Sequence, residues 1–191
     1  MRVIAGHLKG RNIKAVPGKK TRPTSDKVKE AIFHKLGPFF VGGTCLDLFA
    51  GSGALGIEAI SRGIEHTTFI DKSSQSIKTI HQNIKQLQVC NQCTVFRNDV
   101  LKGIKIIGKK QLQYDLILVD PPYEDVSYEK VLHSIEFYNL LQPGGKLYIE
   151  SGSIDAVVFN AAYFSILFEK TYSSTTSVMI LERKPVTCTK D

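Results

Sequence analysis

From residue 44 onward, short apolar segments rich in β-branched residues alternate with amphipathic segments. This alternation limits the fold more than any other feature of the sequence. Strands are predicted at "TCLDLF", "TTFID", "CTVFRN", "YDLILVD" and "GKLYIES", and the end, "YFSILFEKTYSSTTSVMILER", looks like two strands around a polar turn. Helices are predicted from about 54 to 61 and near 128–140, and another helix should carry Ile77, Ile80, Ile84 and Leu87 on one face. A short helical or irregular segment is expected before "YDLILVD". Such alternation builds an α/β fold, a doubly wound and mostly parallel sheet, here with an antiparallel C-terminal strand.

The N-terminal fifth of the chain differs from the rest in charge. Residues 1–35 hold ten Lys and Arg against Asp26 and Glu30, so this segment carries +8 in a chain whose formal net charge is +7. "RVIAG" and "RNIKAV" flank "HLKG", which predicts a short β-hairpin, and "PGKKTRPTS" reads as a basic linker. Concentrated positive charge beside a neutral body favours contact with nucleic-acid phosphates.

These features suggest three segments. Residues 1–24 form a basic hairpin and linker arm, residues 25–184 the α/β domain, and residues 185–191 a tail. Within the domain, a helix is expected over 25–36, with Thr24 or Ser25 as its N-terminal cap.

Several function classes are disfavoured by composition. No apolar run approaches the roughly 20 residues that a membrane span needs, and the first residues lack the apolar core of an export signal, so a cytoplasmic protein without membrane contact is expected. The four cysteines fit reduced thiols better than a disulfide framework in a chain of 191 residues. Cys90 and Cys93 form a single C-x-x-C without a second ligand pair, so no metal site is predicted.

Polar residues end several of the predicted strands. Asp47, Asp71, Asp120 and the pair Asn98–Asp99 all occur there. The carboxyl ends of parallel strands meet at one edge of the sheet, where α/β proteins of this type bind their ligands. We therefore expect these side chains to form one site.

The loop "DLFAGSGALG" predicts the kind of ligand. Gly51, Gly53 and Gly56 match the G-x-G-x-x-G pattern of dinucleotide sites, and Asp71 follows at the distance expected for a ribose contact. Asp47, however, lies on the rim of the pocket, where a carboxylate would oppose a pyrophosphate. An adenosine with a positive, phosphate-free tail fits better, and this interpretation favours S-adenosylmethionine over NAD.

The segment Asp120-Pro121-Pro122-Tyr123 directly follows an apolar strand. Two prolines stop the strand and remove two backbone donors. The turn can present the Asp120 carboxylate and the Pro121 carbonyl as paired acceptors for the two N–H bonds of an aromatic amine, which would stabilise the positive charge that develops on its nitrogen. Tyr123 could stack on the base. The predicted reaction is transfer of a methyl group to an exocyclic amine.

D-P-P-Y together with D-x-F-x-G-S-G resembles the class I amino-methyltransferases that act on nucleic acids, which have a Rossmann-like sheet. The run "MRVIAGHLKGRNIKAVPGKKTRPTSDKVKEAIFHKL" followed by "CLDLFAGSGALGIEAISRG" is similar to the bacterial 16S ribosomal RNA guanine-N2 methyltransferases of the RsmD type. The resemblance runs from Arg2 to about Glu150. It implies methylation of a guanine of the 966 type in 16S rRNA, with S-adenosylhomocysteine as the second product.

The resemblance also implies roles for individual residues. The methionine part of the cofactor would be bound by Asp47, Phe49, Gly51, Ser52 and Gly53. Asp71 would bind the ribose hydroxyls, and Asn98 and Asp99 would lie near the adenine. Thr24 and Arg22 would lie near the cofactor carboxylate or the RNA. Asp120, Pro121, Pro122 and Tyr123 would hold the target guanine, and Arg11, Lys19, Lys20 and Arg22 would bind RNA. Many relatives have Glu where this chain has Asp71.

The implied partner is 16S rRNA or the small ribosomal subunit, and the expected state is a monomer. Other functions stay open at this point. D-P-P-Y also serves DNA adenine and cytosine amino-methyltransferases, although this chain has no insert that would read a DNA target. Release-factor glutamine methyltransferases carry Asn at the position of Asp120. A non-catalytic RNA-binding protein and an NAD-dependent oxidoreductase are further alternatives, disfavoured by Asp120 and Asp47 respectively.

Overall fold

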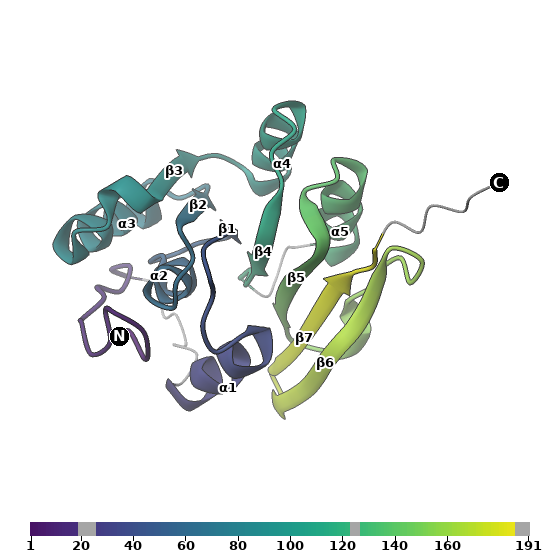
Figure 1. The fold of residues 1–191 in the computed structure, drawn as a ribbon, viewed down its shortest axis with the longest axis horizontal. Coiled ribbons are helices and arrows are strands. Elements are labelled where there is room, and N and C mark those ends of the chain that lie inside the picture. The colour runs from purple at the N-terminus through teal and green to yellow at the C-terminus, as the bar shows by residue number, and fades with distance from the viewer. Residues whose placement is uncertain (19–25, 123–126, 186–191) are drawn as a thin grey trace.

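A seven-stranded sheet crosses the centre of the computed structural model, which describes residues 1–18, 26–122 and 127–185 (Figure 1). The strands are β1 (Thr44–Leu48), β2 (His66–Asp71), β3 (Cys93–Arg97), β4 (Tyr114–Val119), β5 (Leu141–Ser151), β6 (Phe164–Ser173) and β7 (Thr176–Arg183). They lie in the order β3-β2-β1-β4-β5-β7-β6. β7 is antiparallel to both of its neighbours, and the other pairs are parallel, as the sequence predicts.

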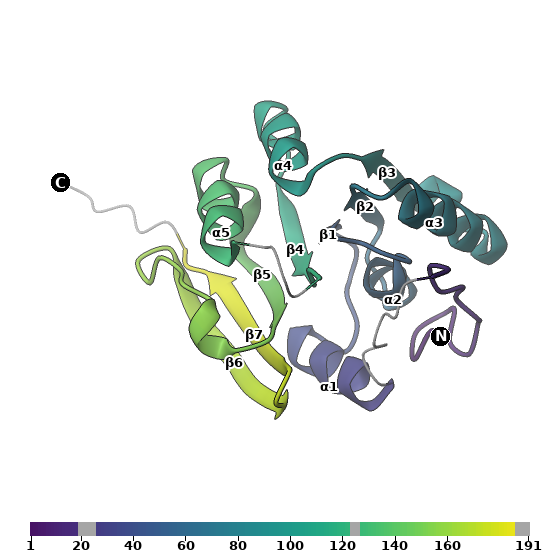
Figure 2. The same ribbon diagram turned by 180° about the vertical axis from the view of Figure 1, so that it is seen from behind.

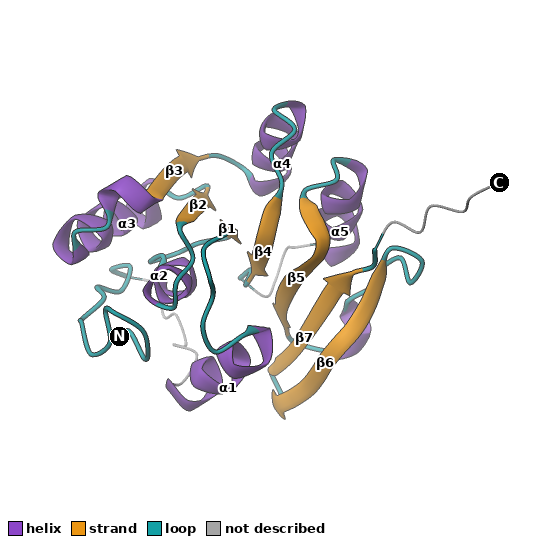
Figure 3. Ribbon diagram, viewed as in Figure 1, coloured by secondary structure: helices purple, strands orange, loops and turns teal. Residues whose placement is uncertain are grey.

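Helices cover both faces of this sheet (Figures 2 and 3). They are α1 (Asp26–Leu36), α2 (Ala54–Ser61), α3 (Ser74–Leu87), α4 (Val100–Lys109) and α5 (Tyr128–Phe137), with short 3₁₀ turns at Cys90–Gln92 and Ile154–Ala156. The segment predicted as helical or irregular is the ten-residue helix α4. The chain order thus produces the doubly wound arrangement, with the reversal of strand order between β1 and β4.

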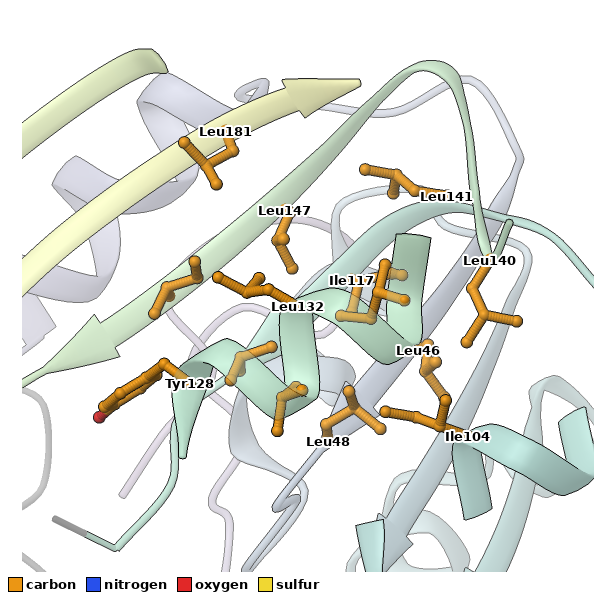
Figure 4. Close-up of a cluster of buried hydrophobic side chains, with 14 of the residues drawn as sticks. Leu46, Leu48, Ile104, Ile117, Tyr128, Leu132, Leu140, Leu141, Leu147 and Leu181 are labelled. Atoms are coloured by element: carbon orange, nitrogen blue, oxygen red, sulfur yellow. The ribbon is translucent and has the colours of Figure 1, made fainter. Parts of the chain in front are cut away.

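The apolar core lies in layers on the two sides of the sheet. Helices α4 and α5 pack on one face against apolar side chains of the strands, among them Leu46, Ile117 and Leu147 (Figure 4). Helix α1 and part of α2 pack on the opposite face, where Phe33 meets Leu118 and Tyr148 in one cluster. Side chains alternate along a strand, so a residue at a strand end points to the same face as the residue two positions before it. The cluster to which that earlier residue belongs therefore identifies the face.

The N-terminal segment, residues 1–18, packs on the α2–α3 side of the domain. One antiparallel bridge, between Arg2 and Asn12, closes it as a minimal hairpin. Val3, Leu8 and Ile13 are buried in a cluster that also contains residues of α2, α3 and β2. The described part of the predicted basic arm is therefore anchored through its apolar side chains, while its charged side chains point outward.

Some expectations lie outside the described residues. These are the cap of α1 by Thr24 or Ser25, the side chains of Lys19, Lys20, Arg22 and Tyr123, and the tail beyond residue 185. Among the described residues no helix is long and apolar enough to cross a membrane. In the same ranges, His, Cys, Asp and Glu side chains form no group of three or more that could hold a metal ion.

Candidate functional site

Carboxylates gather at the C-terminal edge of the four central parallel strands. The register places Ile70 beside Leu48, Leu48 beside Val119, and Val119 beside Ile149. One residue further along, Asp71, Asp120 and Glu150 lie at the same level on β2, after β4 and on β5. Asp47 lies one residue before Leu48 on β1. For Asp47, Asp71 and Asp120, the predicted meeting of strand-end carboxylates is therefore present in the fold.

The glycine loop between β1 and α2 is held by Asp71. Its Oδ2 accepts from the Gly51 amide at 2.8 Å and its Oδ1 from the Ser73 amide at 2.7 Å. Gly51 and Gly53 have φ of 57° and 78°, which glycine adopts without strain. Phe49 has φ of 63°, an uncommon value for a bulky residue. Backbone strain of this kind often marks a ligand site, although the Phe49 ring also packs against the α4–α5 core.

Asp47 is buried beneath this loop, with 2% of its surface exposed. Its Oδ2 accepts from the Gly56 amide at 3.0 Å. Burial raises the pKa of Asp47 to about 7, the Gly56 amide opposes this shift, and the nearby Asp71 adds to it. Burial thus disfavours the ionised form of Asp47 in the protein alone, and a positively charged ligand beside it would favour that form.

Asp120 directly follows β4, on the face of the sheet covered by α1. It is partly exposed, Pro121 is buried and Pro122 is exposed. Burial, followed by the charges of Glu150 and Asp47, raises the pKa of Asp120 well above its usual range. Asp120 is therefore a carboxyl group with strong affinity for a proton, at a position that a substrate can reach.

The predicted adenine-side residues follow β3. Asp99 caps α4, because its Oδ1 accepts from the Lys102 amide at 3.2 Å, and its side chain is exposed. Asn98 lines a pocket of about 310 Å³ on the α4 face, together with apolar residues such as Ile70 and Phe96. Of the predicted site residues that the structure describes, no other lines this pocket. The roles of Asn98 and Asp99 toward an adenine remain predictions.

The glycine loop is joined to the N-terminal segment by Asn83 of α3, which is fully buried. Its Nδ2 donates to the carbonyls of Lys14 at 3.0 Å and Ser52 at 2.9 Å, and its Oδ1 accepts from the Lys14 amide at 2.9 Å. Sequence reasoning misses this residue because a polar residue on an amphipathic helix usually faces solvent. One side chain thus fixes the basic segment relative to the loop.

We expect Asn83→Ala to lower the free energy of unfolding by about 2–3 kcal/mol, because two carbonyls and one amide lose their buried partner. Asn83→Asp should be at least as harmful, since a carboxylate would face the two carbonyls. Urea unfolding measures both. Gln82→Ala, at an exposed position of the same helix, is the matched control and should change stability by less than about 0.5 kcal/mol.

Of the predicted RNA-contacting residues, only Arg11 is described. It is exposed, and its Nη2 donates to the carbonyl of Gln86 near the end of α3 at 3.3 Å. Lys19, Lys20 and Arg22 lie outside the described residues, as do Thr24 and Tyr123, so their roles stay predictions. Sequence reasoning also misses Glu150, although it lies one residue before the end of β5 and Asp120 lies one residue after the end of β4.

The arrangement fits a ligand with a positively charged centre. Within the described part of the chain, Asp47, Asp71 and Asp120 form no ion pair. Their charges would be complemented by a cation held above the glycine loop. A pyrophosphate would instead be placed beside these carboxylates, which electrostatics disfavours. These three carboxylates thus fit S-adenosylmethionine, as the sequence predicts, better than a dinucleotide.

Known proteins resemble this chain in sequence and in fold. The profile of a family described as "Conserved hypothetical protein 95" matches residues 1–181. The Bacillus subtilis protein YlbH, whose name places it among rRNA methyltransferases, is 46% identical over 150 residues, which are 78% of this chain and 82% of YlbH. The ribosomal RNA small subunit methyltransferase D of Haemophilus influenzae is 31% identical over 172 residues, 90% of this chain and 88% of that protein.

A solved structure has the same fold. The Escherichia coli protein yhhF, described as a methyltransferase, superposes with a TM-score of 0.85 and 28% identity, over 96% of this chain and 98% of that chain. The likeness therefore extends over nearly the whole chain, including the N-terminal segment.

Proposed function

The chain belongs to the RsmD-type family of ribosomal RNA methyltransferases, and from this premise we propose that it methylates the exocyclic N2 amine of a guanine in 16S rRNA, at the 966-type position. S-adenosylmethionine would be the methyl donor, since its sulfonium centre carries an activated methyl group. The sequence resemblance and the relatives named as small-subunit rRNA methyltransferases support this proposal.

The observation that carries it is the placement of Asp120. Its carboxylate ends β4 at the strand-order reversal, partly exposed and one strand away from the glycine loop. The Watson–Crick edge of guanine presents hydrogen-bond donors, including the N2 amine, and an ionised carboxylate only accepts. Asp120 and the Pro121 carbonyl would hold the amine, align its nitrogen for attack and favour its developing positive charge.

The cofactor would lie over the glycine loop. Asp47 would face its positive centre, Gly51, Ser52 and Gly53 would allow close approach of the backbone, and Asp71 would accept from the ribose hydroxyls. Both Asp71 oxygens already accept one backbone amide, and each retains a second lone pair for this purpose. Many relatives would have the longer Glu at this position, and here the two backbone amides fix the position of the shorter Asp71 side chain.

The basic N-terminal segment would contact the RNA. Asn83 fixes this segment to the glycine loop, so Arg11, Lys19, Lys20 and Arg22 would be presented from a defined base. The substrate is free 16S rRNA or an assembled small-subunit particle, met in the cytoplasm by a monomeric enzyme.

The experiment that tests the function uses tritiated S-adenosylmethionine with 16S rRNA and with 30S subunits from a strain that lacks this methylation. We expect label in one guanine, recovered as N2-methylguanine after nuclease digestion and mapped by primer extension. Double-stranded DNA is the control substrate. Label in DNA adenine or cytosine, or in protein, would contradict the proposal, and binding of RNA without any transfer would indicate a non-catalytic binding protein.

A further inference from the structure

Glu150 lies beside Asp120 on the neighbouring strand. Because Val119 and Ile149 pair in register, the two following residues are at the same level of the sheet, and the Cα atoms of paired strands are roughly 5 Å apart. Leu118 and Tyr148, two residues earlier, both pack in the cluster under α1. Alternation along the strands therefore directs Asp120 and Glu150 to the same face.

The Glu150 carboxylate is fixed within the fold. It is buried, with 4% of its surface exposed. Its Oε2 accepts from the hydroxyl of Tyr148 at 2.8 Å, and its backbone carbonyl accepts from the hydroxyl of Tyr128 at 3.1 Å. The two tyrosine hydroxyls therefore hold Glu150 in place on β5, beside Asp120.

Other charged and titratable groups lie on the elements packed around Asp120 and Glu150. On β1 the nearest is Asp47, which also acts on Asp120. On α5 the pKa of Tyr128 is raised to about 12 by burial and by the charges of Asp120 and Glu150, so this phenol keeps its proton. On α1, Lys29 contacts Glu58 and Lys35 lies over the Phe168 ring.

We propose that Glu150 is a positioning residue for the methyl transfer: its fixed negative charge beside Asp120 makes Asp120 the proton acceptor for the methylated amine. This inference rests on the proposed function for its substrate. In the reaction, the lone pair of the amine nitrogen forms the N–C bond while the S–C bond breaks and its electrons remain on sulfur. The nitrogen is then positively charged, and one of its protons passes to the Asp120 carboxylate.

The direction of the effect on Asp120 follows from electrostatics. A neighbouring negative charge disfavours a second one, which raises the pKa of Asp120 and strengthens it as a base. Asp120 must be ionised to accept the amine protons, so activity falls as the pH drops through its pKa. Loss of the Glu150 charge lowers that pKa and moves the acid limb of activity to lower pH.

Glu150→Gln tests this directly, because it keeps the shape of the side chain and removes its charge. We expect the acid limb of kcat/KM to move down by about one pH unit and the plateau of kcat to fall by roughly threefold, since the base is weaker. Tyr148→Phe removes the donor that fixes Glu150 and should shift the limb in the same direction by less. Glu169→Gln, at an exposed position on β6, is the matched control and should leave the profile unchanged.

A second measurement does not depend on turnover. Carbon-13 NMR of the Asp120 carboxyl, assigned by its loss in Asp120→Asn, follows its titration in the wild-type protein and in each variant. An Asp120 midpoint that is the same in wild type, Glu150→Gln and Tyr148→Phe would overturn the inference. Failure of the wild-type protein to methylate 16S rRNA at any pH would instead reject the proposed function, and the NMR titration would still decide whether Glu150 acts on Asp120.

Discussion

Asp120→Ala is expected to reduce methyl transfer to rRNA by about 10³-fold, the middle of the range for loss of a positioned acid–base group. The variant loses the carboxylate that would hold the amine and take its proton. The glycine loop and the start of α2 should be unaffected, because their hydrogen bonds to side chains are with Asp71, Asp47 and Asn83. Binding of S-adenosylhomocysteine, measured by calorimetry, should therefore stay within about twofold of the wild-type affinity.

The same substitution should not lower stability. Burial and the charges of Glu150 and Asp47 raise the pKa of Asp120, so its ionised form is held at a cost to the folded state. Folding raises the pKa of Asp120, so Asp120 lowers the free energy of unfolding once the pH rises above its pKa in the unfolded chain. In acid, where the carboxyl group is protonated in both states, it has no such effect. Thermal unfolding at pH 8 should occur at the wild-type temperature or higher, as is common when a functional charge is removed.

The control is Asp155→Ala, which removes a carboxylate from an exposed position and should leave both turnover and stability unchanged. Turnover above about a tenth of the wild-type rate in Asp120→Ala would contradict the assigned role. Loss of stability together with loss of turnover would indicate that Asp120 supports the fold instead.

Much of the fold could be predicted because its signals are local. Helix α2 begins and ends at the predicted residues, Ala54 and Ser61, since a glycine loop precedes it and an apolar strand pattern follows. The ladder of β-branched strands, the C-terminal antiparallel strand and the gathering of Asp47, Asp71 and Asp120 at one edge also follow from alternation and topology alone.

The features that the sequence did not predict depend on contacts between distant segments. Asn83 and Lys14 are far apart in the chain, and neither residue type indicates the other. Glu150 could have been found, because it lies near the carboxyl end of a buried strand as Asp120 does, but its importance depends on which strands are neighbours. The structure shows that Asp99 caps α4, and this finding does not test the predicted contact of Asp99 with the adenine.

The N-terminal segment shows the same limit most clearly. Its basic residues suggest a separate arm, yet Val3, Leu8 and Ile13 are buried in the core cluster with α2 and α3. An apolar residue every five positions in a charged segment is too weak a pattern to predict docking. The glutamate of α2 that receives this segment, Glu58, is also not recognisable from a helix pattern, because a buried charge requires partners from elsewhere in the chain.

Glu58→Ala is therefore expected to lower the free energy of unfolding by about 4 kcal/mol, within the range for breaking one side of a buried ion pair. Glu58 is fully buried. Its Oε1 lies 2.8 Å from Arg62 Nε and its Oε2 3.4 Å from Lys29 Nζ, and both cations are themselves buried. Without Glu58, two positive charges would remain in the core without this counter-charge.

The carboxylate also holds the N-terminal segment. It accepts from the amides of Ile4 at 2.8 Å and Ala5 at 3.0 Å, and Lys29 Nζ donates to the Arg2 carbonyl at 2.8 Å. Burial lowers the pKa of Lys29, and the charge of Glu58 opposes this shift. Removing Glu58 should lower that pKa further, so Lys29 would lose its proton more easily and the segment would be held less firmly.

Urea unfolding gives the stability change, and amide hydrogen exchange at Ile4 and Ala5 reports the release of the segment. Glu58→Gln separates the two effects, because its amide oxygen can still accept one of the two backbone amides while the charge is lost. The amide exchange rates of Ile4 and Ala5 in Glu58→Gln should lie between those of the wild type and of Glu58→Ala. Its free energy of unfolding should be close to that of Glu58→Ala. Glu30→Ala, exposed on α1, should change stability by less than about 0.5 kcal/mol. A loss below about 1 kcal/mol in Glu58→Ala, with unchanged exchange at Ile4 and Ala5, would show that the segment is held by its apolar contacts alone.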